Sequence, residues 1–414
     1  MKRRVFLAAL AGSVASGCYV WPEDGLLNPC LSASLPDSLA GNDLIAAAWE
    51  GVDANRFWDC HVHLLGLGDS GGGAWVNPDM REPTHPILFA QYKFFLNAAC
   101  VDESKQVDDD YVARLLADLS GLAPGTRLML LAFDYAYDED GQRLEAGSHF
   151  HVPNNYTRDV ARRYPGKFEW TASIHPYRED AVSALEEAVR DGARAIKWLP
   201  PSMNIDPASP HCDAFFEALA RLDLPLLSHA GLERAVHVPD AQKLGNPLRL
   251  RRALDHGVRV IVAHCASMGD GEDLDAGPVA PRVSNFDLFA RLMDEPRYEG
   301  LLFGDVSAMT QLNRIGPALD TVLERDDWHS RLINGSDYPL PGVFPLFSMT
   351  EMVDRGYIDE QQANTIRAIR PHNALLFDFV LKRTMRRSGK GFSASVFDSR
   401  RLFEKGTHFQ KGPP

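Results

Sequence analysis

The sequence predicts an α/β protein, a closed (β/α)₈ barrel in which eight parallel strands each precede a helix. Two observations lead to this prediction. Short runs of apolar and β-branched residues alternate with amphipathic stretches from residue 57 to about residue 380, which is the pattern of repeated βα units. Eight such pairs can be counted, and right-handed crossovers between eight parallel strands close the sheet on itself.

The elements follow one another in order along the chain. Strands are predicted at residues 57–63, 127–135, 168–175, 193–199, 224–229, 258–264, 300–307 and 331–336. Helices are predicted at residues 111–122, 155–164, 178–191, 212–222, 247–256, 286–295, 314–324 and 359–370. The longest insertion, residues 64–109, is rich in Gly and Pro and is expected to fold over the barrel mouth as a lid or specificity loop.

Size and charge narrow the class of protein. A barrel with appendages accounts for 414 residues as one large domain. The formal net charge of -13 argues against a nucleic-acid partner, which would require clustered cations. The one dense basic run, residues 382–387, is interpreted as a solvated face outside the core.

The N-terminus has the layout of an export signal. Arg3 and Arg4 precede an apolar stretch and then small residues that lead to Cys18, which resembles a twin-arginine signal joined to a lipoprotein cleavage box. We therefore expect a signal peptide at 1–17, lipidated Cys18, a tether at 18–50, the barrel at 51–380 and a C-terminal tail at 381–414. The protein would be exported, either periplasmic or held to a membrane through the lipid. The alternative is an ordinary cleaved signal in which Cys18 has no special role.

The cysteines exclude one kind of site. Six cysteines are widely scattered and form no CxxC pair, which argues against a structural zinc cluster made of thiolates. An exported protein can form disulfides, but their pairing is not predictable from this sequence.

Polar side chains gather at the carboxyl ends of the predicted strands, where barrels carry their chemistry. These residues are His61, His63, Asp134, His175, Lys197, His229, His264, Asp305 and Asp337. His61 and His63 are two positions apart, so an extended strand directs both imidazoles into the barrel, where they can share a divalent cation. The pair alone is weak evidence, because His149 and His151 repeat the spacing in a loop.

Three further motifs strengthen the interpretation of His61 and His63 as metal ligands. SerHisAla at His229, AlaHisCys at His264 and GlySerAspTyrPro at Asp337 each end a run of buried aliphatics, where an uncompensated polar group would be costly. Together with His61 and His63 these motifs resemble the amidohydrolase superfamily, specifically its amidohydrolase-related group, over roughly residues 57–378.

The resemblance implies a role for each residue. His61, His63, His229 and Asp337 would bind one divalent metal, zinc by donor type although manganese or iron also fits, and would leave a position open for water. Asp337 would also act as general base, and His264 would polarise the substrate or protonate the leaving group. Lys197 would bind substrate or pair with Asp337, or, if carboxylated, would help His264 to hold a second metal.

Function then follows as a set of alternatives. The leading hypothesis is hydrolysis of a small ester, lactone or amide by metal-activated water. Nonoxidative decarboxylation on the same scaffold is the first alternative, and a noncatalytic periplasmic binding lipoprotein is the second. His175, Asp134 and Asp305 are considered as substrate contacts. The sequence predicts no oligomeric state.

Overall fold

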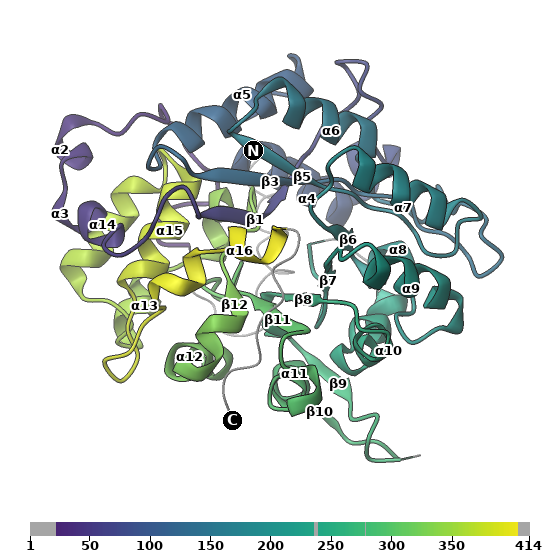
Figure 1. Ribbon diagram of the computed structural model, residues 1–414. Coiled ribbons are helices and arrows are strands. Elements are labelled where there is room, and N and C mark those ends of the chain that lie inside the picture. The colour runs from purple at the N-terminus through teal and green to yellow at the C-terminus, as the bar shows by residue number, and fades with distance from the viewer. Residues whose placement is uncertain (1–21, 236–238, 278, 405–414) are drawn as a thin grey trace.

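The computed structural model describes residues 22–235, 239–277 and 279–404 (Figure 1). The predicted signal peptide at 1–17 and the lipidation site Cys18 lie outside these residues, so they stay predictions. Within the described residues no helix combines the length and the apolar character that crossing a membrane requires.

Eight parallel strands form the centre of the molecule, in two sheets. Three strands pair in the order β1-β3-β5, and five pair in the order β12-β11-β8-β7-β6. Their bounds are β1 Trp58–His63, β3 Arg127–Leu131, β5 Phe168–Thr171, β6 Ile196–Trp198, β7 Leu226–His229, β8 Val260–Ala263, β11 Leu302–Asp305 and β12 Leu332–Ile333. All eight strands predicted from the sequence are therefore present, each shorter than expected.

The two sheets meet at two seams. An isolated parallel bridge joins Ala172, just after β5, to Ile196 in β6, and another joins Val62 in β1 to Tyr338, after β12. The strands thus follow one another in cyclic order, but the described residues form no uninterrupted ladder around the ring. The α/β fold is confirmed, and continuous closure by strand pairing is not shown.

Two apolar layers hold the strands in place. Inside the ring, side chains of seven strands or their ends pack with the chain's C-terminal segment: Trp58, Cys60, Met129, Leu131, Ala195, Leu227, Ile261, Ala263, Phe303, Ile333, Leu402 and Phe403. Outside, a larger cluster fills the space between strands and helices. Such alternation along a strand, one side chain inward and the next outward, is expected of a strand buried on both faces.

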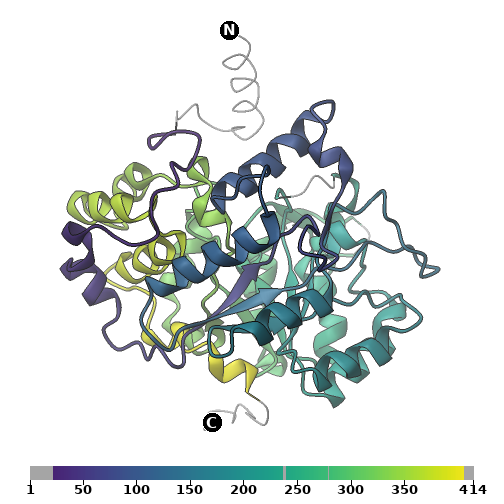
Figure 2. The same ribbon diagram turned by 90° about the horizontal axis from the view of Figure 1, so that it is seen from above.

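The helices lie around the outside of the strands (Figures 1 and 2). Their bounds are α2 Asp37–Ala40, α3 Asp43–Ala48, α4 Pro86–Ala98, α5 Val107–Ser120, α6 Asn154–Arg163, α7 Ala181–Arg190, α8 Pro200–Met203, α9 Asp213–Arg221, α10 Arg251–Asp255, α11 Asn285–Met293, α12 Pro317–Glu324, α13 Met349–Asp354, α14 Glu360–Ile369, α15 Ala374–Thr384 and α16 Arg400–Phe403. Helix α14 begins with a capping box between Asp359 and Gln362, which satisfies two backbone N–H groups at once.

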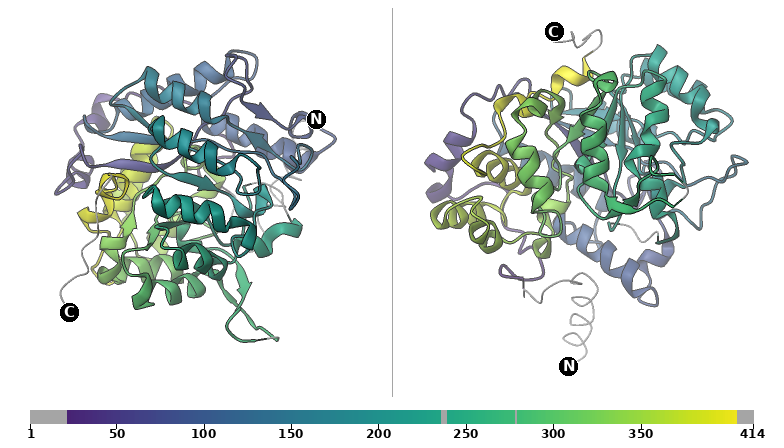
Figure 3. Two further views of the ribbon diagram at one scale, coloured as in Figure 1. Left: turned by 45° about the vertical axis from the view of Figure 1, so that its right-hand side comes forward. Right: turned by 90° about the horizontal axis from the view of Figure 1, so that it is seen from below.

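The long insertion after β1 is folded and fixed to its neighbours. It contains β2 (Trp75–Val76), which pairs with β4 (Phe150–His151) in an antiparallel ribbon, and helix α4. A disulfide joins Cys30 to Cys100 just beyond α4. A second antiparallel hairpin, β9 (Asp270–Glu272) with β10 (Arg282–Ser284), projects from the body (Figure 3).

The C-terminal segment belongs to the folded body as far as residue 404. Helix α15 crosses the predicted domain boundary at residue 380. In Figure 1 the last described helix, α16, lies across the strands, and Phe403 stacks on Trp58 of β1 with ring centroids 6.3 Å apart.

The interpretation of residues 382–387 as a solvated face is wrong for Lys382. Its side chain is fully buried, and Nζ lies 2.6 Å from both Asp378 Oδ2 and the Gly335 carbonyl oxygen. The partner carboxylate stands one helical turn before it, which compensates the buried charge.

Candidate metal centre

Strand β1 delivers two histidines to the carboxyl end of the ring. The pairing of β1 with β3 shifts register between Asp59 and Val62, so the ladder is irregular over the two positions that include His61. Bulges next to active sites redirect side chains. His61 and His63 both face the same point, with ring centroids 5.2 Å apart, as their spacing predicted. His61 is buried, whereas the side chain of His63 is 29% exposed.

Asp337 joins these two histidines from the segment after β12. Its Oδ1 lies 3.4 Å from His61 Nε2 and 3.2 Å from His63 Nε2. One ligand atom from each of the three residues lies within 4.8 Å of the other two, close enough to hold one ion. The backbone of Asp337 is left-handed, with φ of 59°. That conformation is costly for a residue other than glycine and is concentrated at functional sites.

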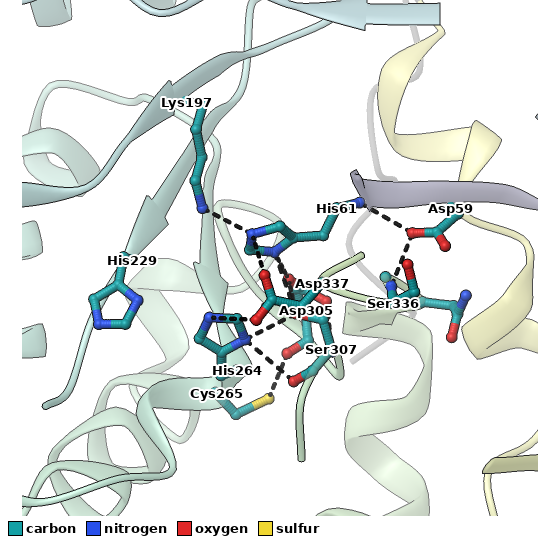
Figure 4. A network of polar contacts seen from close by, with 12 residues as sticks. Asp59, His61, Lys197, His229, His264, Cys265, Asp305, Ser307, Ser336 and Asp337 are labelled. Carbon is teal, nitrogen blue, oxygen red and sulfur yellow. Dashed lines mark hydrogen bonds and ion pairs between the residues drawn. The ribbon is translucent and has the colours of Figure 1, made fainter. Parts of the chain in front are cut away.

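His264 contacts both Asp337 and His61. Its Nε2 lies 3.8 Å from Asp337 Oδ2, and its ring is stacked against that of His61 at 5.1 Å (Figure 4). His264, Cys265 and Ala266 all have positive φ, at 57°, 50° and 49°. Three consecutive nonglycine residues in the left-handed region cost about 1–2 kcal/mol each, so the surrounding packing must hold this turn in place.

Lys197 approaches from β6. Its side chain is buried, and Nζ lies 3.1 Å from His61 Nε2. Burial lowers the pKa of Lys197 below its ordinary value, although nearby carboxylates oppose the effect. A lysine with a lowered pKa is more readily a neutral amine, and the neutral amine is the form that carbon dioxide modifies.

His229 stands apart from the group. Its ring lies 5.4 Å from that of His264, and Figure 4 shows it across the site from His61. Nδ1 lies 3.4 Å from Glu233 Oε2, while the buried Nε2 has no hydrogen-bond partner in the described residues. An orphaned imidazole nitrogen at such a place suits a metal ligand, because buried polar atoms are otherwise paired.

Comparison with known proteins decides the family. A sequence profile described as amidohydrolase matches residues 58–355, which include the eight strands and all the residues above. The chain belongs to the amidohydrolase family. Members of this family are enzymes, hydrolases or decarboxylases, that act on small molecules and bind a divalent metal. No curated protein sequence matches the chain.

Solved structures that resemble this amidohydrolase are distant in sequence. An uncharacterised TIM-barrel protein from Bordetella bronchiseptica is 14% identical with a TM-score of 0.47, covering 78% of this chain and 99% of its own. A 5-carboxyvanillate decarboxylase from Sphingomonas paucimobilis is 11% identical with a TM-score of 0.44, covering 77% and 96%. A probable 2-pyrone-4,6-dicarboxylic acid hydrolase from Acinetobacter baumannii is 12% identical with a TM-score of 0.43, covering 72% and 90%.

The protonation states at the amidohydrolase site suit a divalent cation. Burial lowers the pKa of His61, His229 and His264 well below the ordinary value, which leaves these imidazoles neutral. Burial alone would raise the pKa of Asp337, but His61 and His63 outweigh it and hold this pKa below its ordinary value. Neutral imidazoles and an ionised carboxylate are the forms that bind zinc and similar metals.

Asp305 does not fit the role of substrate contact. It is fully buried, and its Oδ2 lies 2.6 Å from His61 Nδ1, on the side of the ring away from Asp337. Its Oδ1 accepts a hydrogen bond from the backbone N–H of Ser307. The sequence placed Asp305 correctly at a strand end, but periodicity cannot show that another side chain stands between it and the mouth.

His175 and Asp134 are also used within the protein. His175 is fully buried, Nε2 donates to the Met203 carbonyl oxygen at 2.8 Å, and Nδ1 accepts from the Tyr177 N–H. Asp134 accepts from the His175 N–H and forms an ion pair with Arg178 at 2.8 Å. The two residues brace the loops after β3 and β5, so a substrate contact for either has no support here.

Sequence reasoning missed four residues around the site: Asp59, Glu233, Ser307 and Arg314. Asp59 and Ser307 stand two positions from His61 and Asp305, so their places at strand ends could have drawn attention. Arg314 lies in the loop between β11 and α12, and no local pattern distinguishes it. Its guanidinium is buried, and its positive charge helps to lower the pKa of both His229 and His264.

Proposed function

We propose that this protein is a metal-dependent hydrolase that acts on a small ester, lactone or amide. The observation that carries the proposal is the position of Asp337. Its carboxylate lies against His61 and His63 through one oxygen and faces His264 through the other. One group can therefore contribute to metal binding and still accept a proton on the side where His264 stands.

The donors present fit the metal that the family implies. His61, His63, His229 and Asp337 would hold one divalent cation, with zinc or manganese favoured by the mixed nitrogen and oxygen donors. When bound, the metal supplies Lewis acidity, which polarises a carbonyl and lowers the pKa of water. Asp337 Oδ2 accepts the water proton, and His264 Nε2, 3.8 Å away, is placed to receive it and deliver it to the leaving group.

Decarboxylation is the second candidate, and Arg314 is the observation that favours it. The buried guanidinium donates to Ser267 Oγ at 3.2 Å, and its Nε has no partner. No carboxylate in the described ranges of the chain pairs with it. A buried cation with an unpartnered Nε donor beside His229 and His264 suits a substrate carboxylate. A lactone that bears a carboxylate would use the same contact.

The noncatalytic lipoprotein has the least support. A barrel that had lost its chemistry would be free to lose its metal donors, but every expected donor is present and buried or half-buried. The export proposal draws support from the Cys30–Cys100 disulfide, since disulfides persist in oxidising compartments.

The two reactions are distinguished by their products. Purified protein loaded with zinc or manganese is incubated with lactones, esters, amides and aromatic acids in ¹⁸O-labelled water. Hydrolysis incorporates one labelled oxygen into the product, whereas decarboxylation releases carbon dioxide and places no label in the product's carbon framework. Release of carbon dioxide together with an organic product that carries no label would replace the hydrolase with the decarboxylase.

The role of Asp337 is tested by Asp337→Asn, with Asp140→Asn at an exposed loop position as control. We expect the first variant to stay folded and to lose turnover by roughly 10²–10⁴-fold, the range for a general acid or base, and the second to match the wild type. Full turnover by Asp337→Asn would remove Asp337 from the mechanism.

A further inference from the structure

The hydroxyl of Ser307 touches both of the stacked histidines. Ser307 lies two residues beyond Asp305 at the end of β11 and is fully buried. Its Oγ lies 2.8 Å from His264 Nδ1, 3.2 Å from His61 Nδ1 and 2.7 Å from Asp305 Oδ2. The Nδ1 atoms of the two rings therefore contact one buried network (Figure 4).

The hydrogens of this network can be assigned one by one. The Asp305 carboxylate accepts from Ser307 N at Oδ1 and from Ser307 Oγ at Oδ2. With Asp305 in its ionised form, which only accepts, its third contact, His61 Nδ1 at 2.6 Å, is the donor.

The same count of donors and acceptors assigns the hydrogen on the ring of His264. The only hydroxyl hydrogen of Ser307 is given to Asp305, so Ser307 Oγ can only accept from His264 Nδ1. The carbonyl oxygen of Ser307 lies 3.2 Å from the same nitrogen and is also an acceptor. Two independent acceptors thus require that His264 Nδ1 carries a hydrogen.

We propose that Asp305 and Ser307 are positioning residues that fix His61 and His264 in the same tautomer, with the hydrogen on Nδ1. The two Nε2 lone pairs are then directed to the oxygens of Asp337, His61 at 3.4 Å and His264 at 3.8 Å. The tautomers are a property of the metal-free protein and do not depend on the proposed function. Only their expected effect on metal binding rests on that function.

The assignment also decides between the two groups of donor atoms that, among the residues the structure describes, are close enough to hold an ion. One comprises His61, His63 and Asp337, and the other comprises His61, His264 and Asp305. In the second group the short contact of Asp305 is made through an Nδ1 that carries a hydrogen and has no lone pair to give. A cation therefore belongs on the Nε2 side, beside Asp337.

The test is nuclear magnetic resonance of metal-free protein labelled with ¹⁵N-histidine, at neutral pH. Long-range correlations between ring carbon-bound hydrogens and ring nitrogens distinguish the two tautomers, and His61→Gln and His264→Gln assign the signals. We expect both rings of the wild type to carry hydrogen on Nδ1. Hydrogen on Nε2 of either ring would overturn the proposal, whatever reaction the protein catalyses.

The second part of the test uses variants of Asp305 and Ser307, whose zinc affinity is measured by competition against a chromophoric chelator. In Asp305→Asn the amide N–H₂ can donate to His61 Nδ1 and move the hydrogen to Nε2, so we expect weaker zinc binding by about 10–100-fold. Ser307→Ala should release the His264 tautomer, and Ser307→Thr, which keeps the hydroxyl, should restore it. Wild-type tautomers in both Asp305→Asn and Ser307→Ala would contradict the proposal. A protein that binds no zinc would instead contradict the proposed function and leave the tautomer result standing.

Discussion

The carboxylate of Asp59, in the first strand, accepts a hydrogen bond from the backbone N–H of Ser336, 2.8 Å away and 277 residues later in the chain. The same oxygen accepts from the backbone N–H of His61 at 3.2 Å. One buried oxygen thus connects the strand that carries His61 to the segment that carries Asp337, across the seam between the two sheets.

Asp59→Ala and Asp59→Asn should therefore differ. The alanine variant leaves two buried N–H groups without acceptors, at about 1–3 kcal/mol each, and should lower both stability and metal affinity. The asparagine variant keeps an acceptor oxygen and should retain most of both. Thermal unfolding and metal titration of the two proteins check this, and equal stability of the two variants would show that the hydrogen bonds contribute little.

Gly335 leaves room for the site. A Cβ there would lie 2.6 Å from His61 Cβ and 2.8 Å from Asp305 Oδ1. Because His61 Cβ cannot move without its strand, Gly335→Ala should cost roughly 1–3 kcal/mol and weaken metal binding. Gly41→Ala is the matched control, since a Cβ at Gly41 meets nothing within 4 Å and the backbone φ is -99°. Wild-type metal affinity in Gly335→Ala would show that the strand adjusts freely.

Lys197 should act without modification. Lys197→Met removes the charge but keeps the shape, so we expect one metal per chain, as in the wild type, and a loss of turnover of about 10²-fold or more. Atomic absorption and steady-state kinetics measure the two quantities. A carboxylated lysine that bridges two metals predicts instead that the variant loses metal and that added bicarbonate stimulates the wild type.

Asp118 should make stability depend on pH. Burial, which Arg114 only partly offsets, raises the pKa of Asp118 to about 7. In the folded protein Asp118 therefore keeps a proton up to about pH 7, whereas in the unfolded chain the same carboxyl group releases it near pH 4. The sign follows from linkage: the free energy of unfolding falls as pH rises from about 4 to about 7, then levels.

Asp118→Asn removes this dependence. The difference in the free energy of unfolding, variant minus wild type, should be larger at pH 8 than at pH 4.5, by on the order of 1 kcal/mol or more. Denaturant unfolding at the two pH values measures the gain, with the exposed Asp140→Asn as control. An equal difference at both pH values would mean that Asp118 does not hold its proton.

The Cys30–Cys100 disulfide should stabilise the N-terminal segment and α4. It closes a loop with a sequence separation of 70 residues, for which removal of a native disulfide costs about 2–4 kcal/mol. Replacing both cysteines with serine should lower the melting temperature, and a reductant should lower that of the wild type only. In the described part of the chain the cysteines outside this bond, Cys60, Cys212 and Cys265, are buried, so an unchanged wild type under reductant would indicate that the bond is absent.

Much of the fold could be predicted because strands buried on both faces have clear signatures. The predicted strand 127–135 shows where such reasoning stops: pairing with the neighbouring strand ends at Leu131, and Phe133 instead bridges Val152. Apolar pattern reports burial, and it does not report where a buried strand turns into a buried loop.

The residues of the candidate site also separate into those that the sequence pattern predicts and those that it does not. His61, His63 and Asp337 could be predicted to meet because the two histidines stand at the end of one strand, Asp337 follows another, and the strand ends lie together. Arg314 could not, because the course of a loop depends on contacts that no local pattern encodes. The buried charge of Lys382 escaped notice because its partner, Asp378, is recognisable only once the helix and its buried face are known.

The packing of Leu402 and Phe403 inside the ring has a consequence for biosynthesis. Arg259 Nη1 donates to the Leu402 carbonyl oxygen, and Trp58 stacks on Phe403. The base of the ring is thus completed by Leu402 and Phe403, which follow all eight strands in the sequence. The ring can therefore be closed at its base only after every one of these strands has been synthesised.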